Sequence, residues 1–202
     1  MPGLTIGAQI ATSLKLTGLY MKQTVILILP GWQDSEPEQW QGIWLKKFPN
    51  AVKVEQYDWI HTDKQAWVKT LNEYIEKHKG DDIIFVGHSL ACVTFAYWSK
   101  EYAANSPVKV KGALLVGPAD MEAPDLPQEI TGFSPVPLER LNCPTIVVAS
   151  EDDPYVSMDR AKYFAQCWQA RLVNIGRHGH INLKAGFGDW PEGEKLLGEL
   201  ME

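Results

Sequence analysis

The chain has 202 residues, 45% of them hydrophobic and 22% charged, which is the composition of an ordinary soluble globular domain and excludes intrinsic disorder. With 19 basic and 25 acidic residues the formal net charge is −6, which favours neither a nucleic-acid partner nor an anionic membrane surface. The longest apolar run, residues 25–29, is too short to span a membrane, and eight tryptophans are the one unusual feature.

Residues 1–20 have no basic opening and no continuous apolar stretch, so they do not resemble a secretory signal. We expect them to form a loosely ordered extension before a single domain over residues 21–202. Cys92, Cys143 and Cys167 are an odd number of cysteines without CxxC spacing, so neither disulfides nor a zinc site is expected. A reducing, cytoplasmic location fits this pattern best.

The first half of the chain alternates short apolar runs with segments of helical period. A strand is predicted at 24–29, and a helix at 35–48 begins with the capping-box spacing of Ser35 and Glu38. A second strand at 52–56 precedes a helix at 62–79, where Thr62 and Gln65 have the same spacing. A third strand at 83–86 leads into an apolar helix at 92–102.

The second half continues the alternation, with one interruption. A strand at 112–116 is followed by an irregular segment at 118–143 with five prolines, and segments of this length are usually functional or disordered. The remaining predicted strands are 145–149 and 171–175, and the remaining helices are 157–170 and 191–201. The six apolar runs are continuous, as in parallel strands buried on both faces. The pattern therefore predicts one three-layer α/β domain with a six-stranded, mostly parallel sheet.

The strongest motif lies between the third strand and its helix. Gly87, Ser89 and Ala91 fit the pattern G-x-S-x-[GA] at a strand-to-helix turn, which is the setting of a nucleophile elbow. The turn exposes the serine hydroxyl at the positive end of the helix, and the small flanking residues let the backbones come together. Ser89 is the candidate nucleophile; the alternative is a serine that only caps the helix.

A serine nucleophile needs a base and a carboxylate that orients the base. In the α/β-hydrolase arrangement both follow later strands, in the order serine, acid, histidine. Asp152 and Asp153 both follow the fifth predicted strand. We favour Asp153, because Pro154 fixes a turn that can aim one carboxylate inward.

Two histidines, His178 and His180, lie beyond the sixth predicted strand. We favour His180 as the base, because Gly179 before it permits the sharp backbone approach of a catalytic loop. His178 is then a residue at the rim. His88, next to the nucleophile, is expected to pack at the elbow and to contribute to the substrate pocket.

An acyl-transfer site also needs backbone N–H donors for the oxyanion. Leu90, directly after the nucleophile, supplies the first amide, and the turn at Gly31 after the first strand brings the Trp32 amide near the elbow. Gly31, Trp59 and Trp190 are expected to line the substrate pocket with His88. The remaining tryptophans are assigned to the core: Trp40, Trp44, Trp67, Trp98 and Trp168.

Five blocks of the chain resemble those of one group of proteins: LPGWQDSEPEQWQ, FVGHSLACVTFAYW, GPADMEAPDLP, GFSPVPLERLNCPTIVVASEDDPYVS and GHINLKAGFGDWPEG. They are similar to small serine hydrolases of the α/β-hydrolase superfamily, of the retinoblastoma-binding protein 9 / YdeN-like type. The resemblance runs from about residue 25 to residue 197. It implies a minimal α/β-hydrolase fold without a large lid, and it assigns the triad to Ser89, Asp153 and His180. The family usually has glycine where this chain has Ala91.

These residues predict hydrolysis of a small ester, thioester or amide through an acyl-enzyme intermediate, with no cofactor or metal. The alternative is a non-catalytic protein-binding or regulatory module on a hydrolase scaffold, since the family takes its name from a protein partner. Acyl transfer to an acceptor other than water is a third hypothesis. The sequence does not identify the natural substrate or the oligomeric state.

Overall fold

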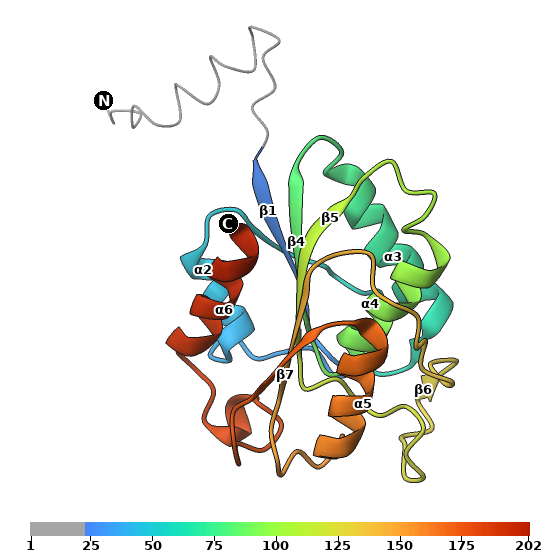
Figure 1. Cartoon of the computed structure of the whole chain (residues 1–202), viewed down its shortest axis with the longest axis vertical. Helices are drawn as coiled ribbons and strands as arrows, with labels where there is room; N and C mark the ends of the chain where they lie inside the picture. The colour runs from blue at the N-terminus through green and yellow to red at the C-terminus, as the bar shows by residue number, and fades with distance from the viewer. Residues whose placement is uncertain (1–22) are drawn as a thin grey trace, which may run out of the picture.

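A computed structural model describes residues 23–202 of the chain (Figure 1), so the extension expected at 1–20 lies outside the described residues. Apolar strands form a six-stranded sheet in the order β2-β1-β4-β5-β7-β8, and every neighbouring pair is parallel. The strands are β1 (Thr24–Leu29), β2 (Ala51–Lys53), β4 (Asp82–His88), β5 (Val110–Val116), β7 (Thr145–Ala149) and β8 (Arg171–Asn174).

Helices cover both faces of this sheet, because the central strands are apolar on both faces. In β1, Leu27 packs into one core cluster and Ile28 into the other. The first cluster is covered by α3 (Lys64–Lys77), α4 (Leu90–Glu101) and α5 (Met158–Trp168). The second is covered by α2 (Trp40–Lys47) and α6 (Pro191–Met201) (Figure 1). The predicted three-layer α/β fold is confirmed.

The helix predicted at 35–48 begins five residues later, at Trp40, and its N-cap Gln39 makes no side-chain capping bond. The capping box predicted at Ser35 and Glu38 is therefore wrong. Residues 36–39 instead form a turn, closed by a 3.0 Å hydrogen bond from the Gln39 amide to the Glu36 carbonyl. This turn folds back on the helix, since a Cβ atom at Gly42 would lie 2.6 Å from the Pro37 carbonyl oxygen.

The predicted cap of α3 is wrong by one residue. Asp63 is the N-cap, and its carboxylate accepts a hydrogen bond of 2.9 Å from the Ala66 amide. Thr62 belongs to β3 (Thr62–Asp63), which pairs in parallel with β6 (Ile130–Thr131) in a separate two-stranded sheet.

The segment predicted to be irregular, residues 118–143, contains no helix and only β6 as regular structure. Besides the β3–β6 pairing, Arg160 of α5 ties it to the domain. The Arg160 guanidinium donates to both Asp120 carboxylate oxygens, at 2.8 and 2.9 Å, and also to Glu122. This segment is therefore held beside the carboxyl ends of the strands.

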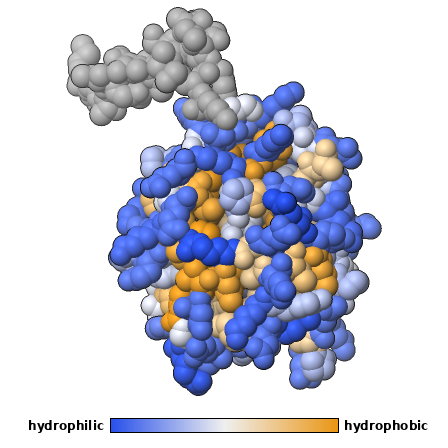
Figure 2. Space-filling view, viewed as in Figure 1, coloured by the Kyte–Doolittle hydropathy of each residue, from blue (hydrophilic) through white to orange (hydrophobic). Residues whose placement is uncertain are grey.

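The face shown in Figure 2 is mostly hydrophilic, with apolar residues exposed in patches between hydrophilic ones. Within residues 23–202, no helix is long and apolar enough to cross a membrane.

Candidate active site

Ser89 lies on a tight turn between β4 and α4, with φ 56° and ψ −118°. This conformation is strained for a residue with a side chain, and it is the geometry expected of a nucleophile elbow. Neighbouring backbone holds the turn: the Ser89 amide donates to the Val116 carbonyl at 2.9 Å. The Ser89 side chain makes no capping hydrogen bond, so the alternative of a simple helix cap is not supported.

Two glycines allow the backbone to come close at this turn. A Cβ atom at Gly87 would lie 2.7 Å from the Phe85 ring and 3.3 Å from the Ala91 carbonyl carbon. A Cβ atom at Gly31 would lie 2.8 Å from the Ser89 Cβ atom. The elbow keeps its geometry with alanine at position 91, where the side chain is fully buried.

Asp153 and His180 form a buried pair at the ends of two later strands. The His180 Nδ1 atom lies 2.9 and 2.8 Å from the two Asp153 carboxylate oxygens. The Asp153 side chain is fully buried, and its Oδ1 atom also accepts the Tyr155 amide at 2.9 Å. The carboxylate is thus fixed in position to orient the imidazole.

The neighbouring candidates have different contacts. Asp152 accepts hydrogen bonds from the Gly179 amide and the Ser150 hydroxyl, at 2.8 and 2.9 Å, and these bonds lower the pKa of Asp152. The His178 ring packs edge-on against Phe187, with centroids 5.7 Å apart. Neither residue belongs to the Asp153–His180 pair.

A cavity of about 600 Å³ opens where β4 ends, and one of its walls comes from residues between 119 and 130 of the irregular segment. Asp153 does not line this cavity because it lies behind His180, fully buried. The lining includes most of the residues predicted for the site: Gly31, Trp32, His88, Ser89, Leu90 and His180.

Trp190 and Trp59 do not line this cavity, contrary to the expectation from the sequence. Trp190 is buried in the core between α2 and α6, stacked on Trp44 with ring centroids 5.9 Å apart. Trp59 packs edge-on against Trp67, and its carbonyl accepts the Gln33 amide at 2.9 Å. Trp59 therefore supports the loop after β1 from outside the cavity.

The two amides expected to form the oxyanion hole both belong to residues that line the cavity. Leu90 is the first residue of α4, so its N–H group has no partner within the helix. In the loop after β1, backbone hydrogen bonds use the amides of Gln33 and Asp34. Within residues 23–202 the Trp32 amide donates no backbone hydrogen bond.

Tyr155 is a site residue that the sequence reasoning missed. Its ring lies edge-on to the His180 imidazole, with centroids 4.5 Å apart, and it lines the cavity. Its position two residues after Asp153 was the available signal. Asp120, an acidic residue expected near the mouth of the site, also lines the cavity. Its partner Arg160 is 40 residues away along the chain, so no local pattern indicates the pair.

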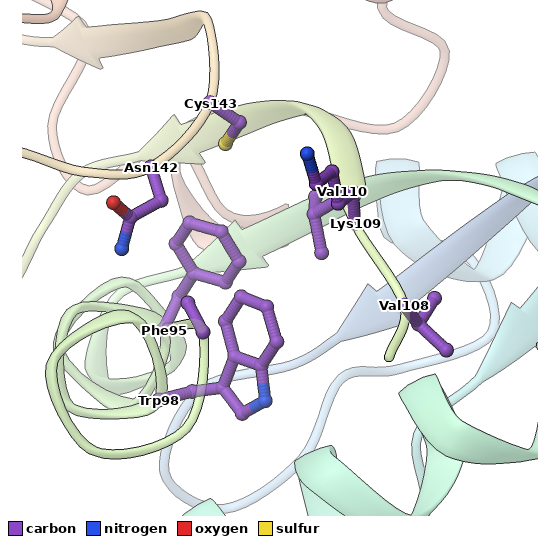
Figure 3. Close-up of a pocket in the computed structure, with 8 residues that line it drawn as sticks. Phe95, Trp98, Val108, Lys109, Val110, Asn142 and Cys143 are labelled. Atoms are coloured by element: carbon purple, nitrogen blue, oxygen red, sulfur yellow. The ribbon is translucent and has the colours of Figure 1, made fainter. Parts of the chain in front are cut away.

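A second cavity, of about 240 Å³, lies near the amino ends of β5 and β7, away from Ser89. Phe95 and Trp98 of α4 line it together with Val110, Asn142 and Cys143 (Figure 3). Burial raises the pKa of the Cys143 thiol to about 11, so this thiol is not a nucleophile at neutral pH.

In the described part of the chain, no three His, Cys, Asp or Glu side chains lie close enough together to hold a metal ion.

A parallel sheet in this order, an elbow serine after its third strand in chain order and an Asp–His pair after later strands define the class of α/β hydrolases. The chain belongs to the serine hydrolase family, whose model matches residues 26–199. No curated protein matches the chain significantly.

Solved structures agree with this assignment. A YdeN-like hydrolase from Pectobacterium atrosepticum superposes with a TM-score of 0.75 and 30% identity, covering 97% of both chains. The ydeN gene product of B. subtilis gives a TM-score of 0.70 and 20% identity, covering 89% of this chain and 99% of its own. Est1E from Butyrivibrio proteoclasticus gives a TM-score of 0.62 and 14% identity, covering 92% of this chain and 91% of its own. The predicted resemblance to small hydrolases of YdeN-like type is confirmed, and the last two structures support the fold alone.

Proposed function

We propose that this hydrolase cleaves small esters, thioesters or amides through an acyl-enzyme intermediate on Ser89. One observation carries the proposal: the strained Ser89 and the histidine of a buried Asp153–His180 pair line the same cavity. The match to the serine hydrolase family over residues 26–199 supports it.

In the proposed mechanism, Asp153 keeps the proton of His180 on Nδ1, which leaves Nε2 free to act as a base. The Ser89 hydroxyl attacks the substrate carbonyl while His180 takes its proton. The amides of Trp32 and Leu90 donate hydrogen bonds to the oxyanion. The bond to the leaving group then breaks, and His180 protonates that group. Water attacks the acyl-enzyme, again with His180 as the base, and releases the acid and Ser89.

The central experiment is labelling with a fluorophosphonate probe, which reacts with an activated serine. We expect wild type to be labelled and Ser89→Ala not to be labelled. Ser99→Ala, on the same helix but outside the cavity, is the matched control and keeps its labelling. Equal labelling of wild type and Ser89→Ala would contradict the proposal and favour the alternative of a non-catalytic binding module.

The substrate class can be narrowed with a panel of nitrophenyl esters of increasing acyl length, tested beside thioesters and aminoacyl arylamides. Added alcohols or amines then separate hydrolysis from acyl transfer, because transfer yields a new ester or amide in place of the acid. A cytoplasmic location, a protein partner by family analogy and the domain boundary at residue 21 stay predictions.

A further inference from the structure

The loop that carries His180, residues 178–182, is held through its backbone by side chains from distant parts of the chain. We refer to it as the histidine loop. On the side of β7, the His178 amide donates to Ser150 Oγ and the Gly179 amide to Asp152 Oδ1, both at 2.8 Å. These two bonds hold the loop just before the base.

The next two backbone groups are held from the other side. The His180 carbonyl accepts a hydrogen bond of 2.8 Å from His88 Nε2, and the Ile181 carbonyl accepts one of 2.9 Å from Trp40 Nε1. A carbonyl oxygen can only accept, so the proton of the His88 ring lies on Nε2. Both donors are buried, and their rings meet edge-on with centroids 6.0 Å apart.

The backbone between these two carbonyls is strained. Ile181 has φ 51°, although it is β-branched, and its side chain is fully buried. A β-branched residue adopts this conformation only where its surroundings impose it. The hydrogen bonds from His88 and Trp40 act on the carbonyls on either side of that residue, so they oppose relaxation of the strain.

We propose that His88 and Trp40 are positioning residues that set the distance between the His180 imidazole and the Ser89 hydroxyl. This inference rests on the proposed function. His88 precedes Ser89 in the chain, so a single side chain links the backbone of the nucleophile to the backbone of the base. Asp153 fixes the orientation of the imidazole ring, whereas His88 and Trp40 fix the position of the loop backbone that carries the ring.

The electrostatics of His88 suit this role. Burial, followed by the nearby His180, lowers the pKa of His88 to about 3, so its ring is uncharged at neutral pH. Because burial disfavours the charged ring, the free Nδ1 atom of His88 is a poor base and does not compete with His180 for the serine proton.

The first test compares His88→Gln with His88→Asn, which carry the same amide at different reach. Glutamine places its N–H group near the position of Nε2, whereas asparagine places it near Nδ1. We expect kcat of the best nitrophenyl ester to fall less than about threefold in His88→Gln and about tenfold or more in His88→Asn, with KM unchanged. The rate of fluorophosphonate labelling should fall in the same order. Equal loss in both variants would overturn the role of His88.

The second test compares Trp40→Phe with Trp168→Phe. Each removes one buried indole hydrogen bond to a carbonyl, since Trp168 Nε1 donates to the Pro137 carbonyl at 2.7 Å. Trp168 belongs to the core cluster on the other face of the sheet from Trp40 and Ile181. A general loss of packing would affect both equally. We expect kcat to fall about fivefold or more only in Trp40→Phe. Equal kcat in the two variants would overturn the role of Trp40.

The experiments distinguish a failure of the proposed function from a failure of the positioning role alone. If wild type shows no labelling that depends on Ser89, the proposed function fails. If wild type is labelled but His88→Asn and Trp40→Phe react as fast as their controls, only the positioning role fails. Thermal unfolding of each variant, followed by circular dichroism, identifies the temperature at which all four are folded and can be compared.

Discussion

Gly31 lies where the loop after β1 meets the elbow, and it permits contact between two segments 58 residues apart. Its Cα atom faces the Ser89 Cβ atom and the His88 carbonyl, and a methyl group there would lie 2.8 and 3.0 Å from those atoms. The elbow backbone cannot easily move away from such a methyl group, because the Ser89 amide donates a hydrogen bond to the Val116 carbonyl of β5. Gly31 therefore allows the Trp32 amide and Ser89 to line the same cavity.

We expect Gly31→Ala to displace Ser89 from the Trp32 amide and to lower the rate of fluorophosphonate labelling about tenfold or more. Gly198→Ala is the control, because a Cβ atom there meets no other atom within 4 Å and a helical alanine is favourable. That variant should be labelled at the wild-type rate. Labelling of Gly31→Ala at the wild-type rate would show that the close approach is not needed.

At the scale of elements, the strands of the main sheet and the helices that cover it could be predicted approximately, but the short pair β3 and β6 and two helix starts could not. Spacing alone makes Ser35 and Thr62 capping residues. Ser35 instead lies ahead of the turn at residues 36–39 that precedes α2, and Thr62 is used in the β3–β6 pairing. Likewise, the spacing of ten positions from His180 to Trp190 does not reveal on which face of the sheet the indole packs. Such features depend on contacts between distant segments, which local patterns do not encode.

The true start of α3 gives a direct test. Asp63→Ala removes the hydrogen bond to the Ala66 amide and should lower the free energy of unfolding by about 1 kcal/mol. Ser35→Ala, at the capping position predicted from spacing, should change it by less than about 0.5 kcal/mol, because no capping bond is present at α2. Urea denaturation measures both. A larger loss in Ser35→Ala than in Asp63→Ala would contradict the assigned N-caps.

At the scale of the whole molecule, the order of the catalytic candidates along the chain could be predicted because the fold brings the carboxyl ends of parallel strands to one edge. That order did not decide between Asp152 and Asp153, which differ only in side-chain direction. The structure pairs Asp153 with the imidazole and Asp152 with the loop backbone. The burial of His88 at this edge of the sheet also affects the free energy of unfolding of the whole protein.

Because the pKa of His88 is lowered to about 3 in the folded protein, the unfolded chain binds a proton at His88 from about pH 6.5 downward, before the folded protein does. The contribution of neutral His88 to the free energy of unfolding is therefore complete above about pH 6.5 and is lost as the pH falls toward 3. His88→Gln lacks this contribution. Between pH 7 and pH 4 we expect wild type to lose about 3 kcal/mol more unfolding free energy than His88→Gln. Denaturation at several pH values measures the difference, and parallel curves would contradict it.

The irregular segment that forms one wall of the cavity at Ser89 is tied to the domain by a two-residue strand pairing and by the contacts of Arg160 with Asp120 and Glu122, among others. It contributes no member of the Ser89–Asp153–His180 set. Met121 is buried in the core and Glu122 bonds to Arg160, so replacements confined to residues 123–127, which line the cavity, can reshape it without disturbing the sheet or the elbow. This stretch is therefore the natural target for changing substrate preference by exchange with the corresponding residues of a related hydrolase.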